Sequence, residues 1–114
     1  YVAAKFGVLG LTKSIAGDLA AHSVTVNCVC PIATATTGMG QVCLDWKMDR
    51  MGVSPEEIDE TTAAAVPLRR NCTEADVINA IMFFVDDASG FLTGQALDVD
   101  GGMLSTAPIA GSGE

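Results

Sequence analysis

Residues 24–30 read Val-Thr-Val-Asn-Cys-Val-Cys, and Pro31 follows them. A short run that is rich in β-branched residues and ends at a proline is typical of a β-strand. The run is almost continuously apolar, which favours a strand of a parallel sheet that is covered on both faces. Residues 1–21 before it have the pattern of a helix. The sequence therefore predicts an α/β fold in which helices and parallel strands alternate.

The helix expected at residues 1–21 carries two stripes at helical spacing. The first stripe is apolar and consists of Val8, Leu11, Ile15 and Leu19. The second is made of small residues, Gly10, Ser14, Gly17 and Ala21. Because a glycine inside a helix costs about 1 kcal/mol relative to alanine, we expect a neighbouring helix or strand to approach this second stripe closely. The alternative is that the segment is simply a weak helix.

Two further helices and a second strand are expected after residue 31. Ser54 at an N-cap, Pro55 at N1 and Glu57 at N3 predict a helix start with a capping box, and the helix should end before Pro67. A similar start at Thr73 predicts a helix over 73–87. Residues 32–53 are irregular apart from an amphipathic segment at 42–51 that suggests a short helix. A strand is predicted at 96–99, and a loose tail at 103–114.

Composition excludes several classes of partner. The chain has 114 residues and a formal net charge of −8, from 14 acidic against 6 basic residues, so a nucleic-acid partner is not expected. No apolar run approaches the roughly 18–20 residues of a membrane-spanning helix. Four cysteines are too few for a disulfide scaffold, which suggests buried, reduced thiols and a cytoplasmic location. With one histidine and no C-x-x-C spacing, no metal site is expected.

Tyr1 and Lys5 are the first candidates for chemistry, because they are four residues apart on one face of the expected helix. A phenol has an ordinary pKa near 10, and a nearby ammonium favours the phenolate and lowers that pKa. Such a pair can exchange a proton with a substrate oxygen. The spacing alone is weak support for this function, since Y-x-x-x-K occurs often by chance.

The surrounding motifs give the pair a context. In order, the chain contains Tyr1-Val-Ala-Ala-Lys5, Gly7-Val8-x-Gly10-Leu11-Thr12, Val26-Asn27-x-Val29-x-Pro31, Thr36, Leu92-Thr93-Gly94-Gln95 and Val99-Asp100-Gly101-Gly102. From residue 1 to about 103 the chain resembles the C-terminal part of the short-chain dehydrogenases/reductases. This resemblance implies the C-terminal portion of a Rossmann-like, doubly wound parallel sheet that binds NAD or NADP. It also implies an enzyme that interconverts a ketone and a secondary alcohol.

The resemblance assigns roles to individual residues. Tyr1 would be the general acid/base, and Lys5 would lower its pKa and hold the nicotinamide ribose. The family's loop P-G-x-x-x-T corresponds to Pro31 through Thr36, so the backbone at Ile32 and Thr34 would contact the nicotinamide carboxamide. Ile32 replaces the usual glycine of this loop. Residues 31–67 would form the cofactor and substrate loop, of which about 37–67 is the family's variable substrate segment.

Other family features are missing from the sequence. The glycine-rich turn that seats the pyrophosphate and the serine that precedes the catalytic tyrosine do not occur in it. We therefore expect an incomplete and inactive fragment of an enzyme that acts as a homo-dimer or tetramer on a small carbonyl or alcohol. A second hypothesis is a non-catalytic association module that dimerises through the helix at 1–21. A third is an unrelated small binding protein whose motifs match by chance.

Overall fold

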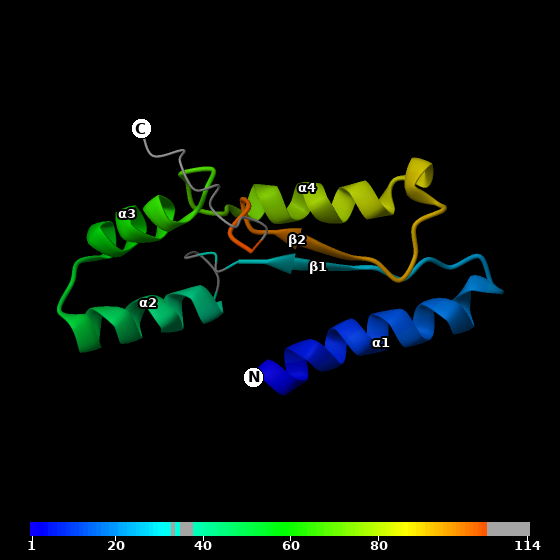
Figure 1. The fold of residues 1–114 in the computed structure, drawn as a ribbon, viewed down its shortest axis with the longest axis horizontal. Helices are drawn as coiled ribbons and strands as arrows, with labels where there is room; N and C mark the ends of the chain where they lie inside the picture. The colour runs from blue at the N-terminus through cyan, green and yellow to red at the C-terminus, as the bar shows by residue number, and fades with distance from the viewer. Residues whose placement is uncertain (33, 35–37, 105–114) are drawn as a thin grey trace, which may run out of the picture. The chain divides into compact units, whose positions relative to one another are not determined.

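The computed structural model describes residues 1–32, 34 and 38–104. Along the chain it contains α1 (Val2–Ala20), β1 (Cys28–Pro31), α2 (Gly38–Met51), α3 (Pro55–Ala65), α4 (Glu74–Val85), the 3-10 helix η1 (Asp87–Ser89) and β2 (Ala96–Val99) (Figure 1). These elements fall into two compact units. The first comprises residues 1–30 and 75–98, and the second comprises residues 31–74 together with the chain from Val99 onward.

The two strands are paired in parallel. The N–H of Cys28 donates to the carbonyl of Gln95 over 2.9 Å, and the N–H of Ile32 donates to the carbonyl of Val99 over 3.2 Å. Both strands advance by four residues in the same direction between these bonds, which is the pattern of a parallel ladder. Figure 1 shows α1 and α4 on opposite sides of this strand pair. The α/β architecture expected from the sequence is confirmed.

β1 begins at Cys28, not at Val24 as predicted from the apolar run. The reason is the hydrogen bonding of Val26, two residues before this start. The N–H of Val26 donates to the hydroxyl of Thr93 over 3.0 Å, and the carbonyl of Val26 accepts from the N–H of Gly94 over 2.7 Å. The backbone at Val26 is therefore bonded to a turn, whereas the ladder starts two residues later. β1 also includes Pro31, which was expected only to end it.

The inner face of α1 differs from the predicted apolar stripe. Thr12 and Ala16 are its buried residues, whereas Val8 and Leu11 are 51% and 58% exposed. Thr12 can be buried because its hydroxyl donates to the carbonyl of Val8 over 2.8 Å, which satisfies the polar group inside the helix. Ala16 lies where a methyl group at Gly94 would approach to 3.5 Å. The neighbouring turn, and not apolarity alone, thus sets which face is covered.

The small-residue stripe of α1 has no close neighbour among the described residues. A Cβ at Gly10 or Gly17 would meet no atom within 4 Å. The close approach that these glycines were expected to permit is therefore absent from the described part of the chain.

The region of the proposed cofactor and substrate loop, residues 31–67, contains both of the helices that the sequence predicted there. α3 starts as expected: the hydroxyl of Ser54 accepts from the N–H of Glu57, and the Glu57 carboxylate accepts from the N–H of Ser54 over 2.8 Å. α2 begins at Gly38, four residues before the amphipathic pattern predicted. Glycine has a low helix propensity, which concealed this start, but Gly40 is buried where α2 meets α3, and this packing outweighs propensity.

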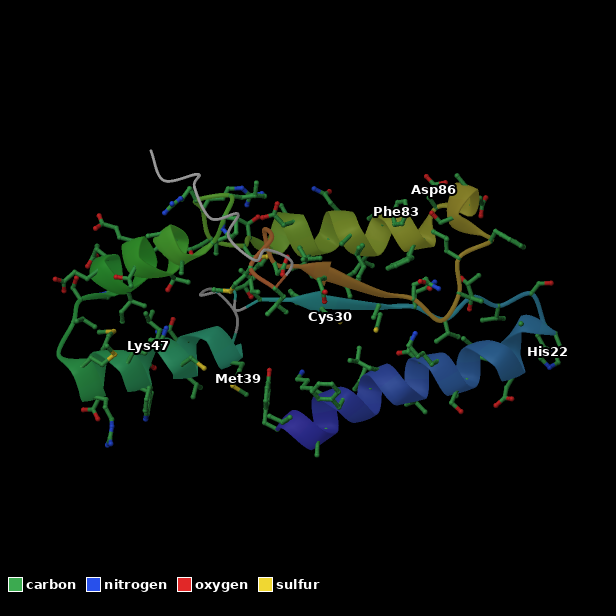
Figure 2. The ribbon with its side chains drawn as sticks, viewed as in Figure 1. His22, Cys30, Met39, Lys47, Phe83 and Asp86 are labelled. Carbon is green, nitrogen blue, oxygen red and sulfur yellow. The ribbon has the colours of Figure 1, made fainter. Side chains whose placement is uncertain are left out.

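α4 ends at Val85, two residues before the predicted end. The Asp86 side chain accepts from the N–H of Ala88 over 2.8 Å and so starts η1 instead of continuing the helix (Figure 2). β2 occupies Ala96–Val99. The predicted tail lies outside the described residues from 105 onward. None of the described helices is both long enough and apolar enough to cross a membrane.

Candidate functional site

Tyr1 and Lys5 are brought together at the start of α1. Tyr1 is the N-cap residue, and its carbonyl accepts from the N–H of Lys5 over 3.0 Å. One helical turn places the Lys5 ammonium 5.4 Å from the centre of the Tyr1 ring. This separation is within the range of a cation–π contact. The pairing that the sequence predicted from an i, i+4 spacing is therefore present in the first unit.

The Tyr1 side chain is open to a partner, since it is 81% exposed. A phenol hydroxyl can donate or accept a hydrogen bond, and an ammonium can only donate. A carbonyl oxygen placed at this hydroxyl would thus meet a proton donor whose ring carries the Lys5 ammonium over it. The arrangement can support proton transfer to oxygen, which is the chemistry expected of this pair.

The predicted cofactor loop follows β1 and belongs to the second unit. Pro31 is the last residue of β1 and is exposed. The Ile32 N–H is bonded to the carbonyl of Val99. A carboxamide contact at Ile32 would therefore use the Ile32 carbonyl. Thr34 is 7% exposed. Thr36 lies outside the described residues.

A cavity of about 510 Å³ lies between α2 and α3, within the second unit. Its lining from α2 consists of Gly40, Cys43, Leu44 and Lys47, which share one helical face. From α3 and beyond it come mainly polar groups, among them Asp59, Thr62 and Asn71. Lys47 projects from α2 on the side of α3 (Figure 2). A cavity of this size and mixed lining is suited to a small organic molecule.

The large side chains of Trp46 and Met48 on α2 do not line the cavity, and Trp46 is 60% exposed. The helical spacing i, i+3, i+4 and i+7 from Gly40 to Lys47 is the signal that identifies the lining face. That signal was hidden because the helix was expected to start only at residue 42.

The described cysteines are all free thiols, as expected, but they are less buried than expected. Cys43 is exposed, and Cys28, Cys30 and Cys72 are half-buried. Burial is the main cause that raises the pKa of Cys30, and the Cys28 thiol and the Asp98 carboxylate raise that pKa further. Cys28 and Cys30 lie two residues apart on β1, so their side chains share one face of the sheet.

Asp100 follows β2 and is 5% exposed. Its carboxylate accepts from the N–H of Leu104 over 2.8 Å and from the N–H of Gly102 over 2.9 Å. These two backbone hydrogen bonds, the one from Leu104 first, hold the pKa of the Asp100 carboxyl below its usual range. The carboxylate thus fixes the turn from Asp100 to Leu104.

A family model described as enoyl-(acyl carrier protein) reductase matches residues 1–104. The chain belongs to the short-chain dehydrogenase/reductase family. Sorbitol-6-phosphate 2-dehydrogenase of Escherichia coli K12 is 35% identical over 104 residues, which cover 91% of this chain and 40% of that protein. The match to this family confirms the resemblance seen in the motifs.

Solved dehydrogenases/reductases share the fold. The sorbitol-6-phosphate 2-dehydrogenase of Erwinia amylovora is 38% identical with a TM-score of 0.79, covering 90% of this chain and 40% of that one. An actinorhodin polyketide ketoreductase solved with NADPH is 33% identical with a TM-score of 0.81, covering 93% of this chain and 40% of that one. The chain therefore has the Rossmann-like fold of the family and spans about 40% of the length of these relatives.

Proposed function

We propose that this chain is the C-terminal part of an NAD(P)-dependent oxidoreductase that interconverts a ketone and a secondary alcohol. The observation that carries the proposal is the Tyr1–Lys5 pair, with the ammonium 5.4 Å from the exposed phenol ring, in a chain of this family. The relatives named as a dehydrogenase and a ketoreductase support the reaction class.

Tyr1 is the general acid/base in this proposal. During reduction its hydroxyl donates a proton to the substrate oxygen, and during oxidation the phenolate takes a proton from the alcohol. Lys5 supplies a positive charge over the ring, and its ammonium donates to the ribose hydroxyls of the cofactor. The bound nicotinamide supplies or accepts the hydride.

The described residues after β1 fit one side of a nicotinamide site. Parallel α/β sheets bind ligands beyond the carboxyl ends of their strands; Pro31 ends β1, and Ile32 and Thr34 follow it. The Ile32 carbonyl can accept from a carboxamide, whereas its N–H stays with Val99. Thr34 and Thr36 complete the proposed cofactor-binding set from this loop.

Two observations support the idea that the chain is incomplete by itself. Many large apolar side chains are exposed, including Phe6, Leu11 and Phe83 at 69%, 58% and 52%. The sequence also lacks the glycine-rich turn that seats a pyrophosphate at a helix N-terminus. We propose that the rest of the sheet covers these side chains in the complete protein. We further propose that this protein is a homo-dimer or tetramer in the cytoplasm, a compartment in which thiols stay reduced.

A second candidate function is favoured by the outer surface of α1. A Cβ at Gly10 or Gly17 would meet no atom within 4 Å among the described residues, and Phe6, Val8 and Leu11 are exposed. A second copy of the helix could approach this surface closely. In this alternative the chain is a non-catalytic association module that dimerises through α1.

The test is the variant Tyr1→Phe in the complete protein that contains this sequence. Removing only the hydroxyl should lower kcat by at least about 100-fold, because general acid–base catalysis contributes about 10²–10⁴-fold. NADPH binding, followed by its fluorescence, should stay within about threefold of the parent value because the ring and its contact with Lys5 remain. Parent-like turnover in Tyr1→Phe would refute the catalytic role of the hydroxyl.

NADPH binding and dimerisation of the isolated 114-residue chain distinguish the two candidate functions. We expect it to bind no NADPH at micromolar concentrations, since the pyrophosphate turn is missing from it. The association module predicts in addition a stable dimer by analytical ultracentrifugation, which Gly10→Leu should disrupt. A monomer would exclude that alternative.

A further inference from the structure

The proposed cofactor and substrate loop, residues 31–67, is bonded near its start and just after its end to the last residue of β2 and to the turn that follows. Near its start, the N–H of Ile32 donates to the carbonyl of Val99 over 3.2 Å. Just after it, the N–H of Leu68 donates to the carbonyl of Gly101 over 3.3 Å. All these residues belong to the second unit. One short stretch, Val99–Gly101, is therefore bonded to Ile32 before the two helices of this loop and to Leu68 after them.

A tight contact reinforces the second attachment. Val66, the C-cap residue of α3, is 1% exposed and is the most buried large side chain among the described residues. A Cβ added to Gly101 would lie 2.5 Å from the Val66 Cγ1 atom and 3.6 Å from the Leu68 Cβ atom. Only a residue without a side chain lets the backbone approach Val66 this closely.

The turn itself is rigidly defined. Gly101 and Gly102 have φ angles of +62° and +89°, in the left-handed region that favours glycine. The Asp100 carboxylate accepts from the N–H of Gly102 and from the N–H of Leu104, so it fixes the backbone on both sides of this conformation. The hydrogen bonds of Asp100 thus stabilise the turn that places Gly101 against Val66.

We propose that Gly101, braced by Asp100, is a positioning residue for substrate binding that acts through Val66. The inference rests on the proposed function of residues 37–67 as the substrate segment. α3 ends at the Val66 contact, and α2 and α3 line the cavity of about 510 Å³. A shift of Val66 would therefore move α3, which forms one wall of that cavity through residues such as Ile58 and Thr62.

The test uses Gly101→Ala and the matched control Gly94→Ala. Both glycines have similar left-handed φ angles, +62° and +69°, but a Cβ at Gly94 would meet only Ala16 at an ordinary 3.5 Å. The two variants hence share the backbone strain and differ in the clash with Val66. In the complete enzyme Gly101→Ala should raise KM for the carbonyl substrate about tenfold with kcat within about threefold, and Gly94→Ala should leave KM unchanged.

A double variant isolates the contact. Val66→Ala in the Gly101→Ala background makes room for the new methyl group and should bring KM back to within about threefold of the parent value. Should Gly101→Ala fail to fold, Val66→Ala alone serves as the test variant, because loss of the valine methyl groups loosens the same contact and should also raise KM. An equal rise of KM in Gly94→Ala, or a double variant without rescue, overturns the proposal.

Hydrogen exchange reports on the anchor independently of activity. Gly101→Ala should accelerate amide exchange of residues 63–68 at least about tenfold relative to the parent, with exchange in α1 unchanged. Unchanged exchange at 63–68 refutes the anchor. Accelerated exchange with an unchanged KM refutes its role in substrate binding. If the parent enzyme turns over no carbonyl at all, the proposed function fails, whereas the exchange result still decides whether the anchor exists.

Discussion

The side-chain oxygen of Asn27 accepts a hydrogen bond from the backbone N–H of Gln95, with 3.0 Å between the two atoms. The same side chain donates from its Nδ2 to the carbonyl of Leu92 over 2.9 Å. One amide thereby joins the residue before β1 to both ends of the turn before β2. Because the partners are more than 60 residues apart, this side chain closes a long loop at the start of the parallel strand pair.

Asn27→Ala should lower the free energy of unfolding by about 1–3 kcal/mol, since it removes two hydrogen bonds worth about 0.5–1.5 kcal/mol each. Chemical denaturation followed by circular dichroism measures the change. The control is Gln41→Ala, which removes an exposed bond to Asp45 within α2 and should cost no more than about 0.5 kcal/mol. Equal losses in the two variants would show that the Asn27 bonds do not hold the strands together.

Ser54→Ala should destabilise α3 by about 1 kcal/mol, because the N-cap hydroxyl satisfies the otherwise unpaired N–H of Glu57. Glu57→Gln is the matched variant. Its amide oxygen can still accept from the N–H of Ser54, so the reciprocal capping bond survives and the loss should be smaller. Thermal unfolding of both variants measures the difference, and a larger loss in Glu57→Gln would contradict this account of the helix start.

Asp100→Asn should lower the melting temperature at pH 7, because the N–H groups of Gly102 and Leu104 bond to different carboxylate oxygens and the amide replaces one of these acceptors by an NH2 donor. The folded-state pKa of Asp100 is depressed, so its stabilisation is present above the unfolded pKa of about 3.9 and is lost as the pH falls below it.

The melting temperatures of the parent and Asp100→Asn should therefore converge as the pH falls below about 3.9 and through the lowered folded-state pKa. A difference that does not shrink as the pH falls would mean that the carboxylate charge is not what stabilises the turn. Asp18→Asn, a change on the exposed surface of α1, controls for the general effect of removing one negative charge.

Cys43 should react with iodoacetamide at pH 8 at least about tenfold faster than Cys30, because the thiolate is the nucleophile and exposure sets its access. Burial and the neighbouring Cys28 and Asp98 raise the pKa of Cys30, which keeps that thiol protonated to higher pH. Peptide mass spectrometry after a short pulse of reagent measures both rates. Faster labelling of Cys30 would contradict its half-buried position on β1 (Figure 2).

Local features of the fold could be predicted from the sequence, and non-local ones could not. The start of α3 depends on Ser54, Pro55 and Glu57, which act within one turn of chain, and the structure forms the expected capping box. The inner face of α1 depends instead on a turn some 80 residues away, where Gly94 meets Lys13 and Ala16. Hydrophobic periodicity therefore selected Val8 and Leu11, which are exposed.

The candidate site divides in the same way. Tyr1 and Lys5 could be paired from their spacing, because residues i and i+4 of a helix are neighbours wherever the helix lies. The role of the Ile32 N–H could not be foreseen, since it depends on the register between β1 and β2. The cavity lining was missed because packing against α3 extends α2 back to Gly38, in spite of two glycines in its first turn.

The sequence by itself determined the family, the α/β class and the pairing of Tyr1 with Lys5, because each of these depends on ordered motifs or on spacing along one helix. Only the tertiary structure decided that Gly101 lies against Val66 and that Ile32 and Leu68 are bonded to Val99 and Gly101. The reason is physical. Helix caps and i, i+4 pairs are set by neighbours in the chain, whereas a contact between Val66 and Gly101 exists only once the strand pairing has placed the turn beside the helix.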